Sequence, residues 1–521
     1  MQPKTVPPIE PAISPGLRRY LYFTAALTGA AILIVEILGA KMLSPYVGTS
    51  HFVWTAQIAV TLVSLATGYY YGGWLVDRSQ RLGRLYQCIL LAAIYLSLTV
   101  AVIEPIAYGC LQFKLATGAL LASTILFFVP LTLLATTGPF LVRVLTQSVS
   151  SVGGNVGRLS AISTLGSVAG TVLIGYVLIP LFPNSVTMYL TAALLMAVTV
   201  GYFLTWGKQN KGKLALAVGT VLGLAIGGVG VWREGRASLE DMEELARANS
   251  NFGRLQVLQN EDGHRYYLND FLTQNTYDPA EKKSISLFTA MLHGLAHAYT
   301  PQVKDVLCIG MGVGIVPMQF VHESAQVDVV EINPAVVPLA QAHFDLQPER
   351  FNLVIGDGRY FINRATKRYD AIILDAFLGD SSPSHLMSRE AFDAMRKILR
   401  PGGVLVINSF GDFTPGKDFL TASLDKTLKA VFRSVRIHAS GNGNVFFVAS
   451  DQPELAILNP PDLELAHPSI RYQVKDAFAS IQQVNPRHGR VLTDDFNPVE
   501  FYDAANRETI RRSLASSMRQ R

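Results

Sequence analysis

The stretch Asp305-Val-Leu-Cys-Ile-Gly310-Met-Gly312-Val-Gly314 joins a short apolar run to three closely spaced glycines. The apolar run is typical of a strand that is buried on both faces of a sheet. The glycines predict a tight turn, and the pattern of residues 315–322 predicts that a helix begins directly after it. Because backbone N–H groups at a helix N-terminus point toward ligands, Gly310, Gly312 and Gly314 are candidate cofactor-binding residues.

Strands and helices alternate on the C-terminal side of this turn. We expect strands at 326–331, 351–357, 369–375 and 404–408, and helices from Pro334 and over 388–399. This rhythm predicts a doubly wound, Rossmann-like α/β domain with a parallel sheet and helices on both faces. On the N-terminal side, turn residues 260–263 predict a β-hairpin over 254–270, and a helix is expected over 279–298.

Acidic residues end the strands that follow the glycine turn, at the edge where open α/β sheets bind ligands. Glu331 lies about 20 residues after the turn, where a carboxylate can bind both ribose hydroxyls. Asp357, followed by Gly358, can accept a hydrogen bond from an adenine amino group, although a helix N-cap explains it equally well. Asp375 begins a loop that continues to Asp380, and a carboxylate there can deprotonate an amine nucleophile. Together these residues predict a nucleoside site. A dinucleotide site is less consistent with the sequence, because Asp357 and Asp375 would have no role in binding NAD.

The residues before about 235 have a different composition. The whole chain has 16% charged residues, against about 25% in soluble domains, and the shortfall lies between Leu21 and Trp206. A transmembrane helix needs about 20 mostly apolar residues. Seven segments meet this length, and they predict an all-α, multi-pass membrane domain: 20–43, 53–76, 86–108, 115–136, 159–182, 185–206 and 213–232.

The arginines and lysines of the short loops predict the orientation of this domain. They lie before the first segment, after the second and before the last, which places the N-terminus in the cytoplasm and the protein in the cell (inner) membrane. Seven crossings would put the globular half on the other side, unless one segment does not cross. The proline-containing stretch 128–147 is a candidate for a re-entrant segment. The side that holds the globular half is left open.

Three further features of the membrane domain are candidates for a functional or a structural role. Glu36 lies deep in the first segment, where a carboxylate is functional or pairs with a neighbour such as Lys41. Gly166 and Gly170 form a small-xxx-small pattern that predicts close helix packing. The stretch 73–78 is similar to a loop motif of major-facilitator transporters, although a charged turn after a helix is the simpler interpretation.

Charge and cysteine content exclude other classes of function. The net charge of +5 comes from clusters in short loops and the tail, and no basic stripe with interleaved aromatic residues predicts a nucleic-acid partner. Cys88, Cys110 and Cys308 lie in or beside apolar segments without the spacing of metal ligands. We therefore expect buried thiols, with neither a disulfide framework nor a metal ion.

The motifs of the globular half resemble the spermidine synthase (polyamine aminopropyltransferase) family, particularly a subgroup fused to an N-terminal multi-span region. The resemblance is carried by the hairpin that ends near Asp270 and Gln274, by the glycine turn, and by five further stretches: 330–334, 355–359, the loop from Asp375, 399–403 and 492–500. The organisation expected from it has four parts: a transmembrane domain at 1–235, a hairpin and linking helix at 236–300, a nucleoside-binding core at 301–455 and a C-terminal extension at 456–521.

The resemblance implies a reaction and roles for individual residues. Such enzymes transfer an aminopropyl group from decarboxylated S-adenosylmethionine to an amine acceptor in polyamine biosynthesis, and no metal is implied. Glu331 would bind ribose, Asp357 adenine, and Asp375 the attacking amine. Asp380 and Asp495 would support the catalytic acid, and Gln274 would lie at the substrate mouth. A homodimer is implied as well, and the transmembrane domain adds the lipid bilayer as a partner.

Two departures from the family pattern keep alternatives open. Val313 stands where active members usually carry an aspartate that holds the aminopropyl ammonium, and residues 287–289 replace a Tyr-His-Glu triplet. One alternative is therefore methyl or other alkyl transfer from intact S-adenosylmethionine. Another, of a different class, is a transporter or sensor gated by a nucleoside-binding domain, for which Glu36 and the stretch 73–78 are the motivation.

Overall fold

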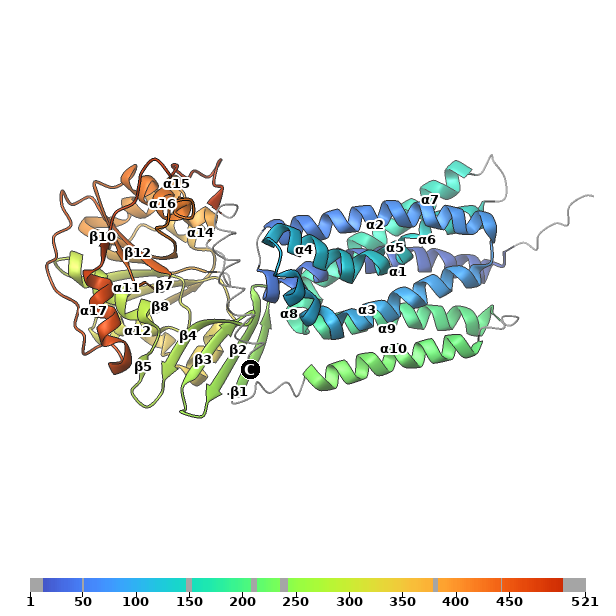
Figure 1. The fold of residues 1–521 in the computed structure, drawn as a ribbon, viewed down its shortest axis with the longest axis horizontal. Helices are drawn as coiled ribbons and strands as arrows, with labels where there is room; N and C mark the ends of the chain where they lie inside the picture. The colour runs from blue at the N-terminus through green and yellow to red at the C-terminus, as the bar shows by residue number, and fades with distance from the viewer. Residues whose placement is uncertain are drawn as a thin grey trace, which may run out of the picture. The chain divides into compact units, whose positions relative to one another are not determined.

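The computed structural model describes residues 13–48, 51–146, 152–207, 213–234, 242–377, 383–441 and 443–499. Its internal contacts divide the chain into two compact units (Figure 1). The helical unit consists mainly of residues up to Ala237, and the α/β unit mainly of residues from Ser238 onward. This division lies close to the change in composition near residue 235.

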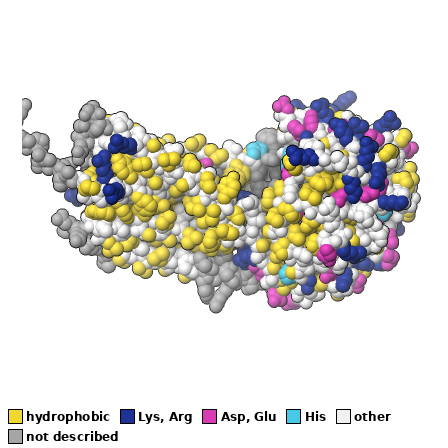
Figure 2. Space-filling model, turned by 180° about the vertical axis from the view of Figure 1, so that it is seen from behind, with side chains coloured by type: hydrophobic (Ala, Val, Ile, Leu, Met, Phe, Trp, Pro, Cys, Tyr) yellow, Lys and Arg dark blue, Asp and Glu magenta, His cyan; other side chains and the backbone are white. Residues whose placement is uncertain are grey.

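All seven apolar segments expected in the helical unit are helical. They form α1 (Pro15–Val47), α2 (His51–Arg78), α3 (Leu82–Cys110), a run from Leu115 to Leu145, a run from Val152 to Leu181, α9 (Asn184–Thr205) and α10 (Lys213–Glu234). Six are long and apolar enough to cross a membrane, and within α10 the stretch Ala217–Gly230 is apolar over a shorter length. The face seen in Figure 2 is accordingly covered mostly by hydrophobic side chains over this unit, whereas charged side chains are common over the α/β unit.

Both helical runs contain a π-helical segment just before a proline. The first run is α4 (Leu115–Ser123), η1 (Thr124–Phe128), α5 (Val129–Ala135) and α6 (Thr137–Leu145), and the second is α7 (Val152–Leu173), η3 (Ile174–Leu178) and α8 (Ile179–Leu181). Pro130 and Pro180 are each the second residue after a π segment. Proline has no N–H and clashes with the preceding turn, so a wider turn accommodates it. Residues 128–145 of the stretch 128–147 thus continue a helix and do not fold back, since Thr136 has helical dihedral angles, and residue 147 lies outside the described residues.

Small residues let α1 and α7 pack backbone against backbone. A Cβ atom on Gly166 would collide with the carbonyl oxygen of Ala26, and one on Gly170 with that of Ala30. The hydroxyl of Ser167 donates to the carbonyl oxygen of Gly29 at 3.1 Å. The packing role expected for these two glycines is therefore confirmed.

Glu36 links two helices of this unit. Its side chain is half-buried in α1 and lies near the hydroxyl of Thr61 on α2. This contact agrees with the structural interpretation, in which Glu36 pairs with a neighbour. Residue spacing alone did not suggest Thr61 as that neighbour.

The α/β unit begins with an antiparallel sheet of five strands in sequential order. They are β1 (Met242–Ser250), β2 (Gly253–Asn260), β3 (Arg265–Asn269), β4 (Leu272–Asp278) and β5 (Lys283–Ser284). The expected hairpin is β2 and β3, which pair from Leu255–Asn269 to Gln259–Arg265. The helix expected over 279–298 begins only at Leu287, as α11 (Leu287–Tyr299), because Lys283 and Ser284 pair with β4 instead.

The second sheet has eight strands in the order β13-β11-β12-β10-β9-β6-β7-β8. The strands are β6 (Asp305–Ile309), β7 (Gln326–Glu331), β8 (Asn352–Ile355), β9 (Tyr369–Leu374), β10 (Leu399–Phe410), β11 (Ser434–Ala439), β12 (Asn444–Ser450) and β13 (Ile481–Gln482). The five from β8 to β10 are parallel, as expected for a Rossmann-like domain. The strands β12, β11 and β13 pair antiparallel, which the sequence pattern did not predict.

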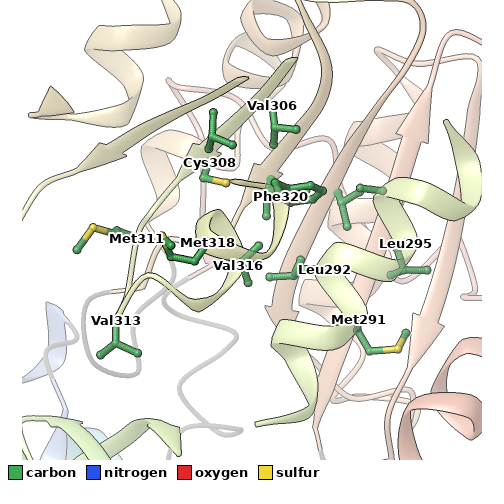
Figure 3. Close-up of a cluster of buried hydrophobic side chains, with 14 of the residues drawn as sticks. Met291, Leu292, Leu295, Val306, Cys308, Met311, Val313, Val316, Met318 and Phe320 are labelled. Atoms are coloured by element: carbon green, nitrogen blue, oxygen red, sulfur yellow. The ribbon is translucent and has the colours of Figure 1, made fainter. Parts of the chain in front are cut away.

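Helices cover both faces of this sheet, and alternate strand residues contribute to two cores. The helices are α12 (Ile315–His322), α13 (Val336–His343), α14 (Gly358–Ile362), α15 (Arg389–Lys397), α16 (Phe419–Lys429) and α17 (Arg471–Ala479). On one face, Val306 and Cys308 of β6 pack with α11 and with Phe320 of α12, as Figure 3 shows. On the other face, Leu307 and Ile309 pack with residues of α15.

The chain reverses its direction of strand addition between β6 and β9. It adds β7 and β8 on one side of β6, and then returns to place β9 on the other side. In open α/β sheets, the ends of two such strands leave a crevice where ligands bind. Here these ends are Gly310 and Asp375.

We expect the substitution Gly166→Leu to destabilise the protein by about 1–3 kcal/mol, because the new side chain cannot fit between α7 and α1. Gly157→Leu is the matched control, since Gly157 lies on the same helix with open space around it. The measurement is the thermal unfolding midpoint of the purified full-length protein. Equal shifts in the two variants would contradict close packing of α1 against α7.

Candidate active site

A cavity of about 590 Å³ lies at the carboxyl ends of the parallel strands. Residues that follow β6, β7, β8 and β9 line it, together with residues of β4 and the first turn of α11. The strands place backbone and carboxylate groups around one space, while the antiparallel sheet and α11 contribute amide, hydroxyl and phenyl groups. The sequence-predicted residues that line the cavity are Gly310, Gly312, Glu331, Asp357, Gly358, Asp375 and Gln274.

The glycine turn forms one wall of the cavity. Gly310, Gly312 and Gly314 all have positive φ angles, of 91°, 52° and 86°. A Cβ atom on Gly310 would collide with the carbonyl oxygen of Asp375, so the two strand ends can approach only because residue 310 is glycine. Gly314, at the start of α12, does not line the cavity and packs against Leu346 instead.

Glu331 is fixed by the backbone on either side of it. Its carboxylate accepts hydrogen bonds from the amide of Met311 at 2.9 Å and from the amide of Asn333 at 2.7 Å. Only 7% of the residue is exposed, and burial raises the pKa of Glu331 although these backbone hydrogen bonds oppose the shift. The carboxylate is thus held rigidly at the end of β7 with lone pairs still available to a ligand hydroxyl.

Asp357 combines the two roles that the sequence suggested. One carboxylate oxygen caps α14 by accepting from the amide of Tyr360 at 2.8 Å. The other lies 3.1 Å from Nε2 of His385. Because both Asp357 and His385 also line the cavity, the pair presents polar groups to any ring bound beside the third strand.

Asp375 is held by two asparagines from neighbouring strands. Nδ2 of Asn408, on β10, donates to a carboxylate oxygen of Asp375 at 2.9 Å, and Nδ2 of Asn444, on β12, donates to Oδ1 of Asn408 at 3.0 Å. Burial raises the pKa of Asp375 to about 6; the hydrogen bond from Asn408 opposes this shift and the charge of Glu331 adds to it. A carboxylate with such a pKa is ionised at neutral pH and can take up a proton readily.

The remaining predicted site residues lie elsewhere. Asp495 is exposed and does not line the cavity. Its neighbour Asp494 accepts from Arg359 at 2.7 Å, so the C-terminal acidic stretch is tied to the start of α14 through Asp494. Asp380 lies outside the described residues.

Sequence reasoning missed Asn408, Asn444 and His385. Asn408 offered a usable signal, because it is a polar residue in a buried apolar strand. It also missed an apolar part of the lining, where the rings of Phe377 and Phe410 lie 5.2 Å apart and Phe252 and Phe288 contribute from other elements.

The charge of the cavity is one-sided. In the part of the lining that the structure describes, Glu331, Asp357 and Asp375 are the acidic residues, and neither lysine nor arginine is present. Val313 lines the same space and is 1% exposed, in the turn between β6 and α12 (Figure 3). Such a cavity favours a cationic ligand over a phosphate-bearing one.

Comparisons with known proteins agree with this geometry. The family described as "Spermine/spermidine synthase domain" matches residues 286–441. The polyamine aminopropyltransferase of Vibrio vulnificus is 31% identical over 243 residues, which are 43% of this chain and 78% of that protein.

Two further proteins match parts of the chain. Putrescine N-methyltransferase 2 of Nicotiana attenuata is 35% identical over 126 residues, which are 23% of this chain and 34% of that protein. The crystal structure of spermidine synthase from Thermotoga maritima is 20% identical in sequence. The match covers 45% of this chain and 87% of that chain, with a TM-score of 0.34. By its similarity to the Vibrio enzyme and its family match, the chain belongs to the spermidine synthase (polyamine aminopropyltransferase) family and is an aminopropyltransferase-like enzyme.

Proposed function

We propose that this enzyme transfers an aminopropyl group from decarboxylated S-adenosylmethionine to an amine acceptor. The observation that carries the proposal is the pairing of Glu331 and Asp375, two fixed carboxylates at the ends of β7 and β9 that face one cavity whose described lining contains neither lysine nor arginine. The donor carries a sulfonium and an ammonium, and the acceptor is a di- or polyamine. Each would supply the positive charge that the described lining lacks.

The residues present fit the nucleoside of such a donor. Glu331 can accept hydrogen bonds from two ribose hydroxyls, because its own amide contacts hold it in place and leave lone pairs free. Asp357 and His385 can contact the adenine ring beside β8. The glycine turn lets the nucleoside lie close to the backbone, and the phenyl rings of Phe377 and Phe410 supply apolar surface for the aliphatic parts of the two substrates.

The chemistry requires one nucleophilic displacement and one proton transfer. The lone pair of the acceptor amine attacks the methylene carbon beside the sulfonium, and a C–N bond forms as the C–S bond breaks. The bonding electron pair passes to sulfur, so methylthioadenosine leaves as a neutral thioether. The new ammonium loses a proton to Asp375, which Asn408 orients through its hydrogen bond. Most of the rate enhancement then comes from positioning and from the negative field around the cationic centres.

A second candidate is methyl transfer from intact S-adenosylmethionine to an amine. Val313 favours it, because this uncharged side chain stands where the family usually places an aspartate for the aminopropyl ammonium. The similarity to a putrescine N-methyltransferase is consistent with the same cavity serving either donor.

We further propose that the helical unit spans the cell membrane with its N-terminus in the cytoplasm. The support is the length and hydropathy of six helices, together with hydrophobic side chains that remain exposed on them, such as Leu62, Leu165 and Val172. Lysine and arginine side chains gather toward one end of this unit (Figure 2). Arg78, at the end of α2, lies 4.0 Å from the ring of Trp74, an aromatic–basic pair typical of a membrane interface.

The membrane assignment predicts that the chain stays in the membrane pellet after an alkaline carbonate wash, because helices of this length are removed only by detergent. Immunoblotting of the pellet and the supernatant is the measurement. A soluble enzyme from the same cells serves as the control for complete washing. Recovery of the chain in the supernatant would contradict insertion.

The reaction itself predicts the products. Purified full-length protein incubated with decarboxylated S-adenosylmethionine and a panel of di- and polyamines is expected to release methylthioadenosine and an aminopropylated amine, both identified by mass spectrometry. With intact S-adenosylmethionine, the methyl-transfer candidate predicts S-adenosylhomocysteine and a methylated amine instead. Release of neither product, from protein that binds methylthioadenosine, would refute both reactions.

Replacement of the base predicts a loss of rate and a change in pH dependence. We expect Asp375→Asn to lower kcat by about 10²–10⁴-fold, because no carboxylate remains to take the proton. A base acts in its ionised form, so the wild-type kcat/KM, which reports the free enzyme, is expected to fall as the pH decreases through about 6, and the Asn variant is expected to lack this limb.

The control for this substitution is Asp393→Asn. Asp393 is a half-exposed carboxylate on α15 that pairs with Lys397 and does not line the cavity. We expect it to leave kcat and the pH profile unchanged. An Asp375→Asn variant that binds methylthioadenosine normally and keeps the wild-type rate would remove Asp375 from the mechanism.

A further inference from the structure

We propose that His293, His297 and Glu323 bind a divalent transition-metal ion that cross-links helices α11 and α12. None of the three residues lines the active-site cavity. Each offers one ligand atom, and these atoms all lie within 4.8 Å of one another. The site is separate from the transfer reaction and does not depend on which donor the enzyme uses.

The local sequence brings the three side chains together. His293 and His297 are one helical turn apart on α11, so their side chains lie on the same face of the helix. Glu323 caps the C-terminus of α12, where its backbone N–H donates to the carbonyl oxygen of Phe320. The two helices pack through apolar residues that include Leu292 and Phe320, so the histidines and the glutamate meet beside a rigid core (Figure 3).

The distances within the cluster suit coordination. Nε2 of His293 lies 3.0 Å from one carboxylate oxygen of Glu323, and Nε2 of His297 lies 2.8 Å from the other. An ion bound tetrahedrally at 2.0–2.2 Å from nitrogen and oxygen ligands would hold its ligand atoms about 3.3–3.6 Å apart. The two nitrogen–oxygen distances would therefore have to lengthen by roughly half an ångström to admit the ion.

The orientation of the imidazole rings supports a metal site independently of the distances. Both Nε2 atoms are shielded from solvent, yet neither makes a hydrogen bond of acceptable geometry, although a carboxylate oxygen is close to each. His293 is only 5% exposed, so bulk water cannot hydrogen-bond to its Nε2. An oxygen that is close to the nitrogen but off its axis is the arrangement expected when both atoms bind one ion. The ring of Phe320 lies 4.8 Å from that of His293 and 5.8 Å from that of His297, which fixes both imidazoles.

The ligand set defines the class of ion. Two imidazole nitrogens and one carboxylate suit Zn²⁺ and its neighbours Co²⁺ and Ni²⁺, whereas Mg²⁺ and Ca²⁺ prefer oxygen ligands. The side chain of Glu323 is 36% exposed, so water can occupy the fourth position. Because the first turn of α11 and the first residues of α12 line the cavity, a metal cross-link between these helices would stabilise the walls of the active site.

The test uses full-length protein purified without a histidine tag and stripped of metal with a chelator. Binding of Zn²⁺ is measured by equilibrium dialysis with elemental analysis, and binding of Co²⁺ by its visible absorption. The variants are His297→Ala and Glu323→Gln, both at partly exposed positions that are expected to fold. The matched control is His322→Ala, since His322 is an exposed histidine next to Glu323 and is not part of the cluster.

We expect wild-type protein and His322→Ala to bind Zn²⁺ at least about tenfold more tightly than the other two variants. We also expect Co²⁺ to give a tetrahedral spectrum only in the first two, and Zn²⁺ to raise only their thermal unfolding midpoints. Equal Zn²⁺ binding in all four folded proteins, or none in any, would overturn the proposal and leave a His–Glu–His contact without metal. Because methylthioadenosine release is measured separately, failure of the metal site is distinguishable from failure of the transfer reaction.

Discussion

The close approach of two backbones, at Gly310 and Asp375, is the constraint on which the active site depends. The strands β6 and β9 are paired neighbours, and the amide of Asp375 donates to the carbonyl oxygen of Ile309 at 3.0 Å. A side chain at residue 310 would occupy the position of the Asp375 carbonyl group. Because residue 310 is glycine, the turn bends away with a φ of 91° and the cavity opens between the strand ends. The Glu331 carboxylate then binds the same turn through the amide of Met311, so one tight turn positions both carboxylates.

The two carboxylates make the cavity responsive to the charge of its ligand. Burial raises the pKa of both Glu331 and Asp375, and the charge of Glu331 raises that of Asp375 further. A sulfonium bound between them would favour their ionised forms and so reverse part of these shifts. Binding of a cationic donor would therefore prepare Asp375 as a base at the moment when an acceptor amine needs one. Asn408 and Asn444 contribute by holding the carboxylate in one orientation, so that little reorganisation accompanies the reaction.

Much of this arrangement could be predicted from the sequence, because strand ends follow from hydrophobic periodicity. That periodicity located β6, β7 and β9, and with them Gly310, Glu331 and Asp375. The pairing of Asn408 with Asn444 could not be predicted, because it depends on the antiparallel pairing of β10 with β12. A helix and a strand separate these two strands in the sequence. The same reason explains why α11 begins at Leu287, where pairing of β5 with β4 ends. In the C-terminal stretch, tertiary contact with Arg359 selects Asp494 over Asp495, and no local pattern distinguishes the two.

Val313 is the residue at which the two candidate reactions make opposite demands. Without a carboxylate at this position, the ammonium of a decarboxylated donor loses one of several negative partners, and Asp375 remains among them. An intact donor would instead bring its own carboxylate into a lining that, where described, contains three acids and neither lysine nor arginine. Burying a carboxylate costs several kcal/mol, and the donor's own ammonium offsets only part of that cost, whereas a charge-assisted hydrogen bond contributes about 1.5–3 kcal/mol. The charge of the cavity as a whole therefore outweighs the single substitution, and it favours the decarboxylated donor.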